Sequence, residues 1–111
     1  MSADAPFNTL AALLRPYAGR MQVKRDDAQE LYLEETRSGT KPQLFAAVQI
    51  KKSYVALHVF ALYLHPEWVA DLSEPLRKRM QGKSCFNFRP SDDIPVAELT
   101  ALLERAEIAL G

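Results

Sequence analysis

The 111-residue sequence has a single cysteine, no excess charge of either sign and no long hydrophobic run. One cysteine cannot form an internal disulfide, and this usage is typical of a reducing compartment. The 14 basic and 14 acidic residues cancel, so no overall field attracts nucleic acid or anionic membranes. The first six residues lack the basic and apolar regions of a secretion signal, and no apolar run reaches the roughly 20 residues that span a bilayer. We therefore expect a cytoplasmic protein without a membrane partner.

The composition is that of an ordinary globular domain, with 48% hydrophobic and 25% charged residues. A chain of this length buries enough surface to fold without a metal or a disulfide, so we expect one domain over residues 1–111. The sequence contains no internal repeat. Alternating apolar and polar residues predict five strands, over residues 21–25, 31–34, 44–51, 54–62 and 84–89. Helical spacing predicts helices over residues 7–14, 66–69, 76–80 and 95–110.

Capping and turn residues mark the ends of these elements. Pro6 suits the first turn of the first helix, and Pro16 is expected to end or bend that helix. Ser73 is expected to cap the helix over residues 76–80, which Gly82 would end in a left-handed conformation. The order α-β-β-β-β-α-α-β-α with short links favours antiparallel hairpins. We predict an α+β fold: one five-stranded, mostly antiparallel sheet with the N- and C-terminal helices packed on one face.

The strands over residues 44–51 and 54–62 have one apolar face and one mixed face. The apolar face carries Leu44, Ala46, Val48, Ile50, Val55, Leu57 and Val59. The mixed face carries Phe45, Ala47, Gln49, Lys51, Tyr54, Ala56, His58 and Phe60. If Phe86 and Phe88 point into the core, the last strand adds Cys85, Asn87 and Arg89 to the mixed face.

Aromatic residues with a few convergent polar groups are typical of binding sites. The candidate ligand-binding residues are Lys51, Tyr54, His58, Lys83, Cys85, Asn87 and Arg89, with Tyr32 and Gln49 on the same face. Two outcomes remain open. Either this face binds a small ligand or a protein partner, or the segments around Trp68 and Leu76 fold back and cover it.

The segment 77–85 contains residues of three chemical motifs. Gly82-Lys83-Ser84 resembles the end of a phosphate-binding loop, but the required first glycine is replaced by Arg77 and the segment leads into a strand. The basic cluster Arg77, Lys78, Arg79 and Lys83 is interpreted as a solvated helix face, which disfavours nucleic acid as a partner. Cys85 shares a face with His58, so a Cys–His pair and a thiol enzyme are geometrically allowed.

The two histidines, His58 and His65, have no metal-ligand spacing to each other or to Cys85. We therefore expect no metal and no cofactor. The most economical interpretation is a non-enzymatic binding module, a monomer or weak homodimer.

The stretches FAAVQIKKSYVALHVFALYLHPEW and LRKRMQGKSCFNF resemble a bacterial family of small proteins called YdhG-like, and the resemblance extends over essentially the whole chain. It implies an α+β sandwich with the antiparallel sheet predicted above. Some distant relatives are similar to frataxins, which implies iron binding or delivery as an alternative function. Frataxin-like binding uses an acidic ridge on the first helix, whereas residues 7–18 here contain no Asp or Glu. Hard iron sites need clustered carboxylates, so this departure disfavours iron.

Overall fold

The structure is a computed structural model that describes residues 4–37 and 41–110. The loop predicted over residues 38–42 lies partly outside the described residues. The helices and strands are, in chain order, α1 (Asp4–Ala18), β1 (Gln22–Asp26), β2 (Glu30–Glu35), β3 (Gln43–Ile50), β4 (Val55–Val59), α2 (Ala61–Leu64), the 3₁₀ helix η1 (Pro66–Asp71), α3 (Glu74–Arg77), β5 (Cys85–Phe88) and α4 (Val96–Ile108).

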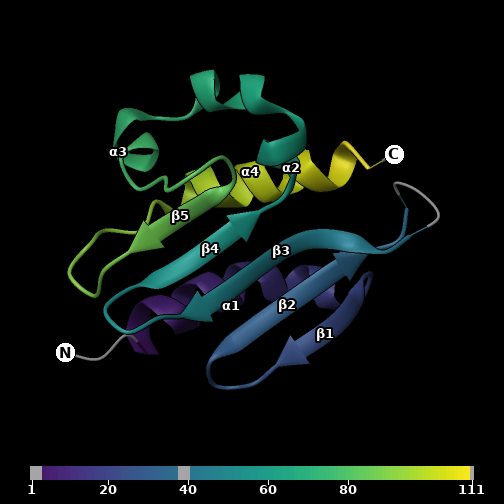
Figure 1. The fold of residues 1–111 in the computed structure, drawn as a ribbon, viewed down its shortest axis with the longest axis horizontal. Helices are drawn as coiled ribbons and strands as arrows, with labels where there is room; N and C mark the ends of the chain where they lie inside the picture. Colours follow the sequence, from purple (N-terminus) through teal and green to yellow (C-terminus); the bar gives the residue numbers. More distant parts are fainter. Residues whose placement is uncertain (1–3, 38–40, 111) are drawn as a thin grey trace.

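The five strands form one antiparallel sheet in the order β1-β2-β3-β4-β5, so each strand pairs with its neighbour in the chain (Figure 1). The turn between β1 and β2 is held by Asp27, whose Oδ1 accepts the backbone N–H groups of Gln29 and Glu30 at 2.8 and 3.0 Å. A side-chain oxygen that binds the backbone two residues on is the usual reason for Asp in turns. The α+β fold and the antiparallel sheet are as predicted.

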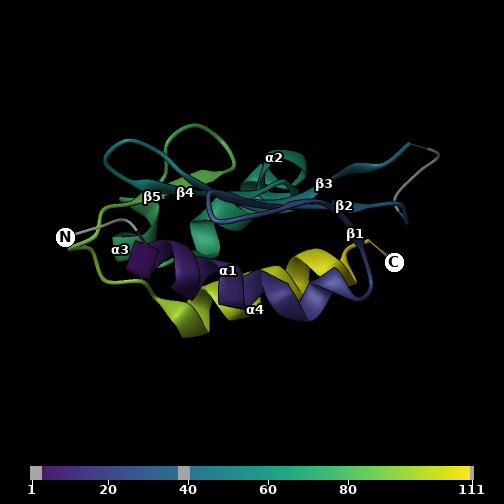
Figure 2. The same cartoon turned by 90° about the horizontal axis from the view of Figure 1, so that it is seen from below.

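Helices α1 and α4 pack side by side against one face of the sheet (Figure 2). The core lies between these two layers. Its fully buried side chains come from alternate positions of the strands and from one stripe of each helix: Leu10, Leu14, Leu31, Leu33, Val48, Leu57, Phe86, Phe88, Leu99 and Leu103. Glu107 of α4 accepts from Arg20, just after α1, at 2.8 and 3.0 Å, which ties the two helices together at one end.

Strict alternation fails at Phe45. We predicted this ring on the mixed face, but it is 3% exposed and packs in the core, with its centroid 5.3 Å from that of Tyr17 in α1. The register shifts between β2 and β3 there: Leu33 lies opposite Ala46, and Glu34 lies opposite Leu44. Phe45 is thus the extra residue of a β-bulge, and a bulge re-aims the side chain it carries.

Two predicted boundaries are also wrong. Helix α1 runs on to Ala18 with Pro16 inside it, so the proline does not end the helix. Strand β4 ends at Val59, and Leu62 belongs to the short helix α2, where it is buried in the same core. An apolar run of this length does not reveal from its own periodicity where a strand gives way to a helix.

The segment between α3 and β5 differs most from the prediction. Ser73 caps α3 as expected, accepting the N–H of Leu76, but the helix ends at Arg77. Met80 then forms a β-bridge with Phe86. On either side of it, the N–H of Asn87 donates to the carbonyl of Arg79 (2.7 Å) and the N–H of Gln81 donates to the carbonyl of Cys85 (2.8 Å). These bonds fix residues 79–81 along the outer edge of β5. Gly82 is left-handed (φ 80°), as predicted, but it makes the turn of this return and does not end the helix.

The two edges of the sheet are therefore different. Segment 79–81 covers the β5 edge, while β1 is exposed at every residue and carries Lys24 and Arg25 next to a register shift. A charged, irregular edge strand pairs poorly with other strands. In the described part of the chain, no helix is long and apolar enough to cross a bilayer.

Candidate functional site

The face of the sheet opposite α1 and α4 carries no helix in the described structure. The 3₁₀ helix η1 and helix α3, which contain Trp68 and Leu76, lie beside β5 and close the end of the core (Figure 1). The alternative in which these segments fold back over the mixed face is therefore wrong. We call this uncovered surface the open face.

Cross-strand rows build the open face. Tyr32 lies opposite Ala47, Ala47 opposite His58, and His58 opposite Cys85, so one row crosses four strands. Ala47 and Ala56 are only 1% and 2% exposed, because larger neighbours on the same face stand around them. The centre of the open face thus has a low, apolar floor with polar and aromatic side chains around it.

The predicted Cys–His pair exists in the structure. The Sγ atom of Cys85 lies 3.8 Å from Nε2 of His58 and 3.5 Å from Oδ1 of Asn87. Burial raises the pKa of the Cys85 thiol, and the positive charge of Lys51 only partly opposes this. Burial likewise lowers the pKa of His58, with a further lowering from Lys51 and a smaller opposing effect of Glu30. Both groups are therefore favoured in their neutral forms, whereas a nucleophilic cysteine needs the thiolate.

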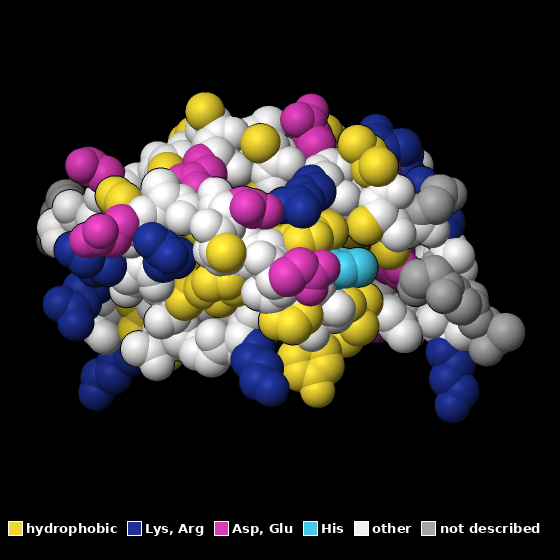
Figure 3. All heavy atoms as spheres, turned by 90° about the horizontal axis from the view of Figure 1, so that it is seen from above, with side chains coloured by type: hydrophobic (Ala, Val, Ile, Leu, Met, Phe, Trp, Pro, Cys, Tyr) yellow, Lys and Arg dark blue, Asp and Glu magenta, His cyan; other side chains and the backbone are white. Residues whose placement is uncertain are grey.

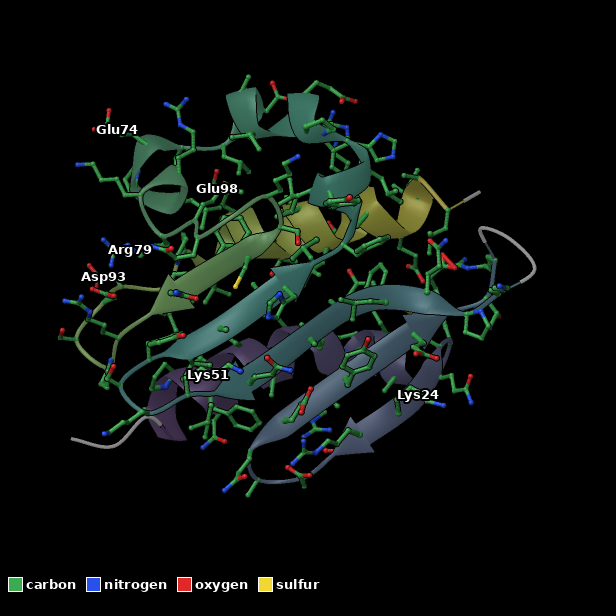
Figure 4. All side chains as sticks on the ribbon, in the orientation of Figure 1. Lys24, Lys51, Glu74, Arg79, Asp93 and Glu98 are labelled. Carbon is green, nitrogen blue, oxygen red and sulfur yellow. The ribbon has the colours of Figure 1, made fainter. Side chains whose placement is uncertain are left out.

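A polar cavity of about 380 Å³ opens at the end of the open face, between the β3–β4 turn and the covered edge of β5. Its lining comes from three segments: Ser53, Tyr54, Lys78, Arg79, Gln81, Asn87 and Arg89. We call it the basic cavity, because three of these residues are cationic and none of the described residues in its lining is acidic. Figure 4 shows Arg79 at the same end of the molecule as Lys51, with Lys24 on the opposite edge strand.

The charges around the basic cavity are unequally compensated. Asp92 Oδ2 accepts from Arg79 Nη1 at 2.7 Å and from the backbone N–H of Arg89 at 2.8 Å. The bond to the Arg89 backbone, followed by the bond to Arg79, lowers the pKa of Asp92. Lys78 Nζ lies 3.4 Å from Glu74, but both side chains are more than 60% exposed (66% and 71%), so water screens this pair. Among the described residues, the Arg89 guanidinium has no ion pair.

The seven predicted site residues separate into three groups. Tyr54, Asn87 and Arg89 line the basic cavity. Lys51, His58 and Cys85 stand on the open face outside it. Lys83 lies apart.

Lys83 borders a more apolar groove of about 570 Å³, together with Tyr63, Val69 and Met80. Its Nζ atom lies 5.9 Å from the ring centroid of Tyr63. Seen from above, hydrophobic side chains gather over α2 and η1 (Figure 3).

Sequence reasoning missed four residues of the basic cavity: Ser53, Lys78, Arg79 and Gln81. It assigned Lys78 and Arg79 to a solvated helix. In the structure the helix ends at Arg77, and the following residues turn toward β5. A glycine shortly before a strand, as Gly82 is, is compatible with a tight turn back onto that strand as well as with a helix end. This was the sequence signal that could have placed residues 78–81 beside the last strand.

The described residues offer no group suited to a metal ion. Within residues 4–37 and 41–110, no three His, Cys, Asp or Glu side chains lie close enough together to hold one. The arrangement thus adds nothing in favour of the frataxin-like alternative.

Comparison with known proteins gives no match to a family model, to a curated protein or to a solved structure. The resemblance to YdhG-like proteins therefore remains a hypothesis.

Proposed function

We propose that this protein is a non-enzymatic binding domain in which the open face and the basic cavity at its end bind a small ligand. One observation carries the proposal: no helix of the described structure covers the open face, and this face leads into a cavity of about 380 Å³ that Tyr54 and Asn87 line. That volume falls in the usual range of small-molecule sites. A cytoplasmic location fits the single thiol of the chain.

The other functions considered have less support. A thiol enzyme would need a depressed pKa at Cys85, and burial acts in the opposite direction. An iron carrier would need clustered oxygen ligands. A protein partner would fit the low centre of the open face around Ala47 and Ala56, but a concave, polar end favours a ligand small enough to enter it.

The test is a fragment screen of the full 111-residue chain by ¹⁵N–¹H correlation NMR, with neutral and charged fragments. We expect the amide signals of Tyr54, His58 and Asn87 to move together with saturating shifts. Tyr54→Leu should weaken these shifts, and Tyr63→Leu is the matched control, because Tyr63 lies in α2 and lines neither the open face nor the basic cavity. If fragments bind only elsewhere, or if both variants behave alike, the proposed site is wrong.

A further inference from the structure

Charge and donor geometry in the basic cavity indicate the class of ligand, an inference that rests on the proposed function. Three cations reach it from two segments: Lys78 and Arg79 follow α3, and Arg89 follows β5. Among the described residues, two carboxylates lie against this set: Asp92 binds Arg79 at 2.7 Å, and Glu74 lies 3.4 Å from Lys78. Lys78 has only a screened partner in Glu74. The three cations outnumber the two carboxylates, and because water screens the exposed Glu74, the net positive charge at the cavity is about one to two.

A net positive set of this kind favours an anion that carries more than one negative charge. A phosphate monoester carries about −1.5 to −2 charges at pH 7 and has three strong acceptor oxygens. A carboxylate carries one charge and two oxygens. An arginine guanidinium binds phosphate oxygens in a bidentate fork, and Arg89 has a guanidinium without an ion pair within the described residues.

The neutral residues of the cavity add donors for the same oxygens. Ser53 and Tyr54 have hydroxyl groups, and Gln81 and Asn87 have side-chain amides. Such groups donate to a phosphate and also bind polar groups of an attached organic moiety. The ring of Tyr54, at the boundary with the open face, offers an apolar surface beside the charged end.

One of the three cations, Arg79, is also held in place by the fold. The backbone of Arg79 accepts the N–H of Asn87 at 2.7 Å, and its guanidinium is fixed by Asp92 at 2.7 Å. The N–H of Arg89 donates to the same Asp92 oxygen at 2.8 Å. One carboxylate thus fixes the guanidinium of Arg79 and the backbone of Arg89 relative to β5. Groups held before the ligand arrives lose less entropy on binding.

We infer that the basic cavity binds the phosphate monoester group of a small molecule, with Arg89 and Lys78 as the principal charge partners and Arg79 held by Asp92 as a third donor.

The experiment titrates the protein with inorganic phosphate, phenyl phosphate and acetate at constant ionic strength, followed by ¹⁵N–¹H correlation NMR. Phosphate and phenyl phosphate should produce saturating shifts at Ser53, Gln81, Asn87 and Arg89, and acetate should bind at least about tenfold more weakly. Arg89→Gln should weaken phenyl phosphate at least about tenfold, as expected for loss of a charge-assisted contact. Arg77→Gln is the matched control, since Arg77 belongs to the same basic cluster but does not line the cavity. It should leave the affinity unchanged.

The outcomes separate the two proposals. If phosphate and phenyl phosphate cause no saturating shift while other fragments still bind at Tyr54, the phosphate inference fails and the binding domain stands. If nothing binds, both fail. If Arg77→Gln and Arg89→Gln weakened phenyl phosphate binding equally, the effect would come from the overall charge of the protein, and the inference would be overturned. Stronger binding of a single-stranded oligonucleotide than of phenyl phosphate would also overturn it. The protein can also be tested for flotation with lipid vesicles. If it floated with phosphatidic acid vesicles but not with phosphatidylcholine vesicles, and Arg89→Gln abolished flotation, the result would support a phosphate monoester ligand and show that a lipid carries it.

Discussion

His58 Nε2 and Cys85 Sγ face each other at 3.8 Å across the β4–β5 pair, yet both residues are favoured in their neutral forms. The arrangement resembles a Cys–His catalytic pair in distance alone. Cys85 is partly exposed and senses the charge of Lys51, but burial outweighs that charge, so the thiolate is not favoured.

Alkylation of Cys85 should therefore be slow at neutral pH. Because burial raises the pKa of the thiol, the rate of iodoacetamide labelling should increase with pH along a curve centred above the ordinary value of 9.0. Lys51→Gln should move the curve to still higher pH, since the charge of Lys51 lowers this pKa. Mass spectrometry at a series of pH values gives the rates. A curve centred near neutral pH would restore the thiol enzyme as a candidate.

His58 should make stability depend on pH between about 5 and 7. Burial lowers its pKa below 6.5 in the folded protein, so in this range the unfolded state binds more protons and the free energy of unfolding rises with pH. This contribution is complete above pH 7 and is lost as the pH falls through 6.5. Because His58 is only half-buried, water screens part of this effect, and we expect the loss to be small but measurable.

Urea unfolding of the wild type and of His58→Gln at pH 7 and pH 5 tests this effect. The variant should lose less stability between the two pH values than the wild type does. Comparing the differences removes the packing cost of the substitution, which is the same at both pH values. An equal loss in both proteins would contradict the assignment.

Phe45→Ala should destabilise the protein by about 3–5 kcal/mol, the range for a buried phenylalanine. The ring is in the core against Tyr17 because of the bulge. Phe60→Ala is the control: this half-buried ring stacks on Tyr63 at 5.5 Å, and its loss should cost about 1 kcal/mol. Chemical denaturation measures both values. If Phe45→Ala cost no more than Phe60→Ala, the ring would lie on the open face as simple alternation predicts.

Gly82→Ala should cost about 1–2 kcal/mol, because an L-residue at φ 80° is strained even where no neighbour blocks its Cβ. Gly19→Ala has equally open surroundings but no positive φ, and its stability should be unchanged or slightly higher. Thermal unfolding of the pair gives the difference. Similar melting temperatures for the two variants would show that the turn at Gly82 does not need this conformation.

Side-chain periodicity predicted the architecture because it depends on local rules. Alternation placed Leu57, Phe86 and Phe88 in the core and His58 and Cys85 together on the other face, as the structure has them. It failed at Phe45, because a bulge depends on how two strands pair and not on either strand alone.

The basic cavity could not be predicted for a similar reason. Its lining joins a turn after β3, a return after α3 and the end of β5, and their proximity follows from β5 pairing with β4. Strand order is a tertiary property, and the sequence pattern left it open. Lys78 and Arg79 line the basic cavity only because segment 79–81 lies along β5.

The bond between Glu107 of α4 and Arg20 after α1 also bears on biosynthesis. The hairpins of β1–β4 can form while the chain is still being elongated, since each strand pairs with the one made just before it. Helix α1, however, lacks its neighbour until residues 96–108 have left the ribosome. Until then part of the apolar stripe of α1 is exposed, and such transiently exposed apolar surface favours association with other chains.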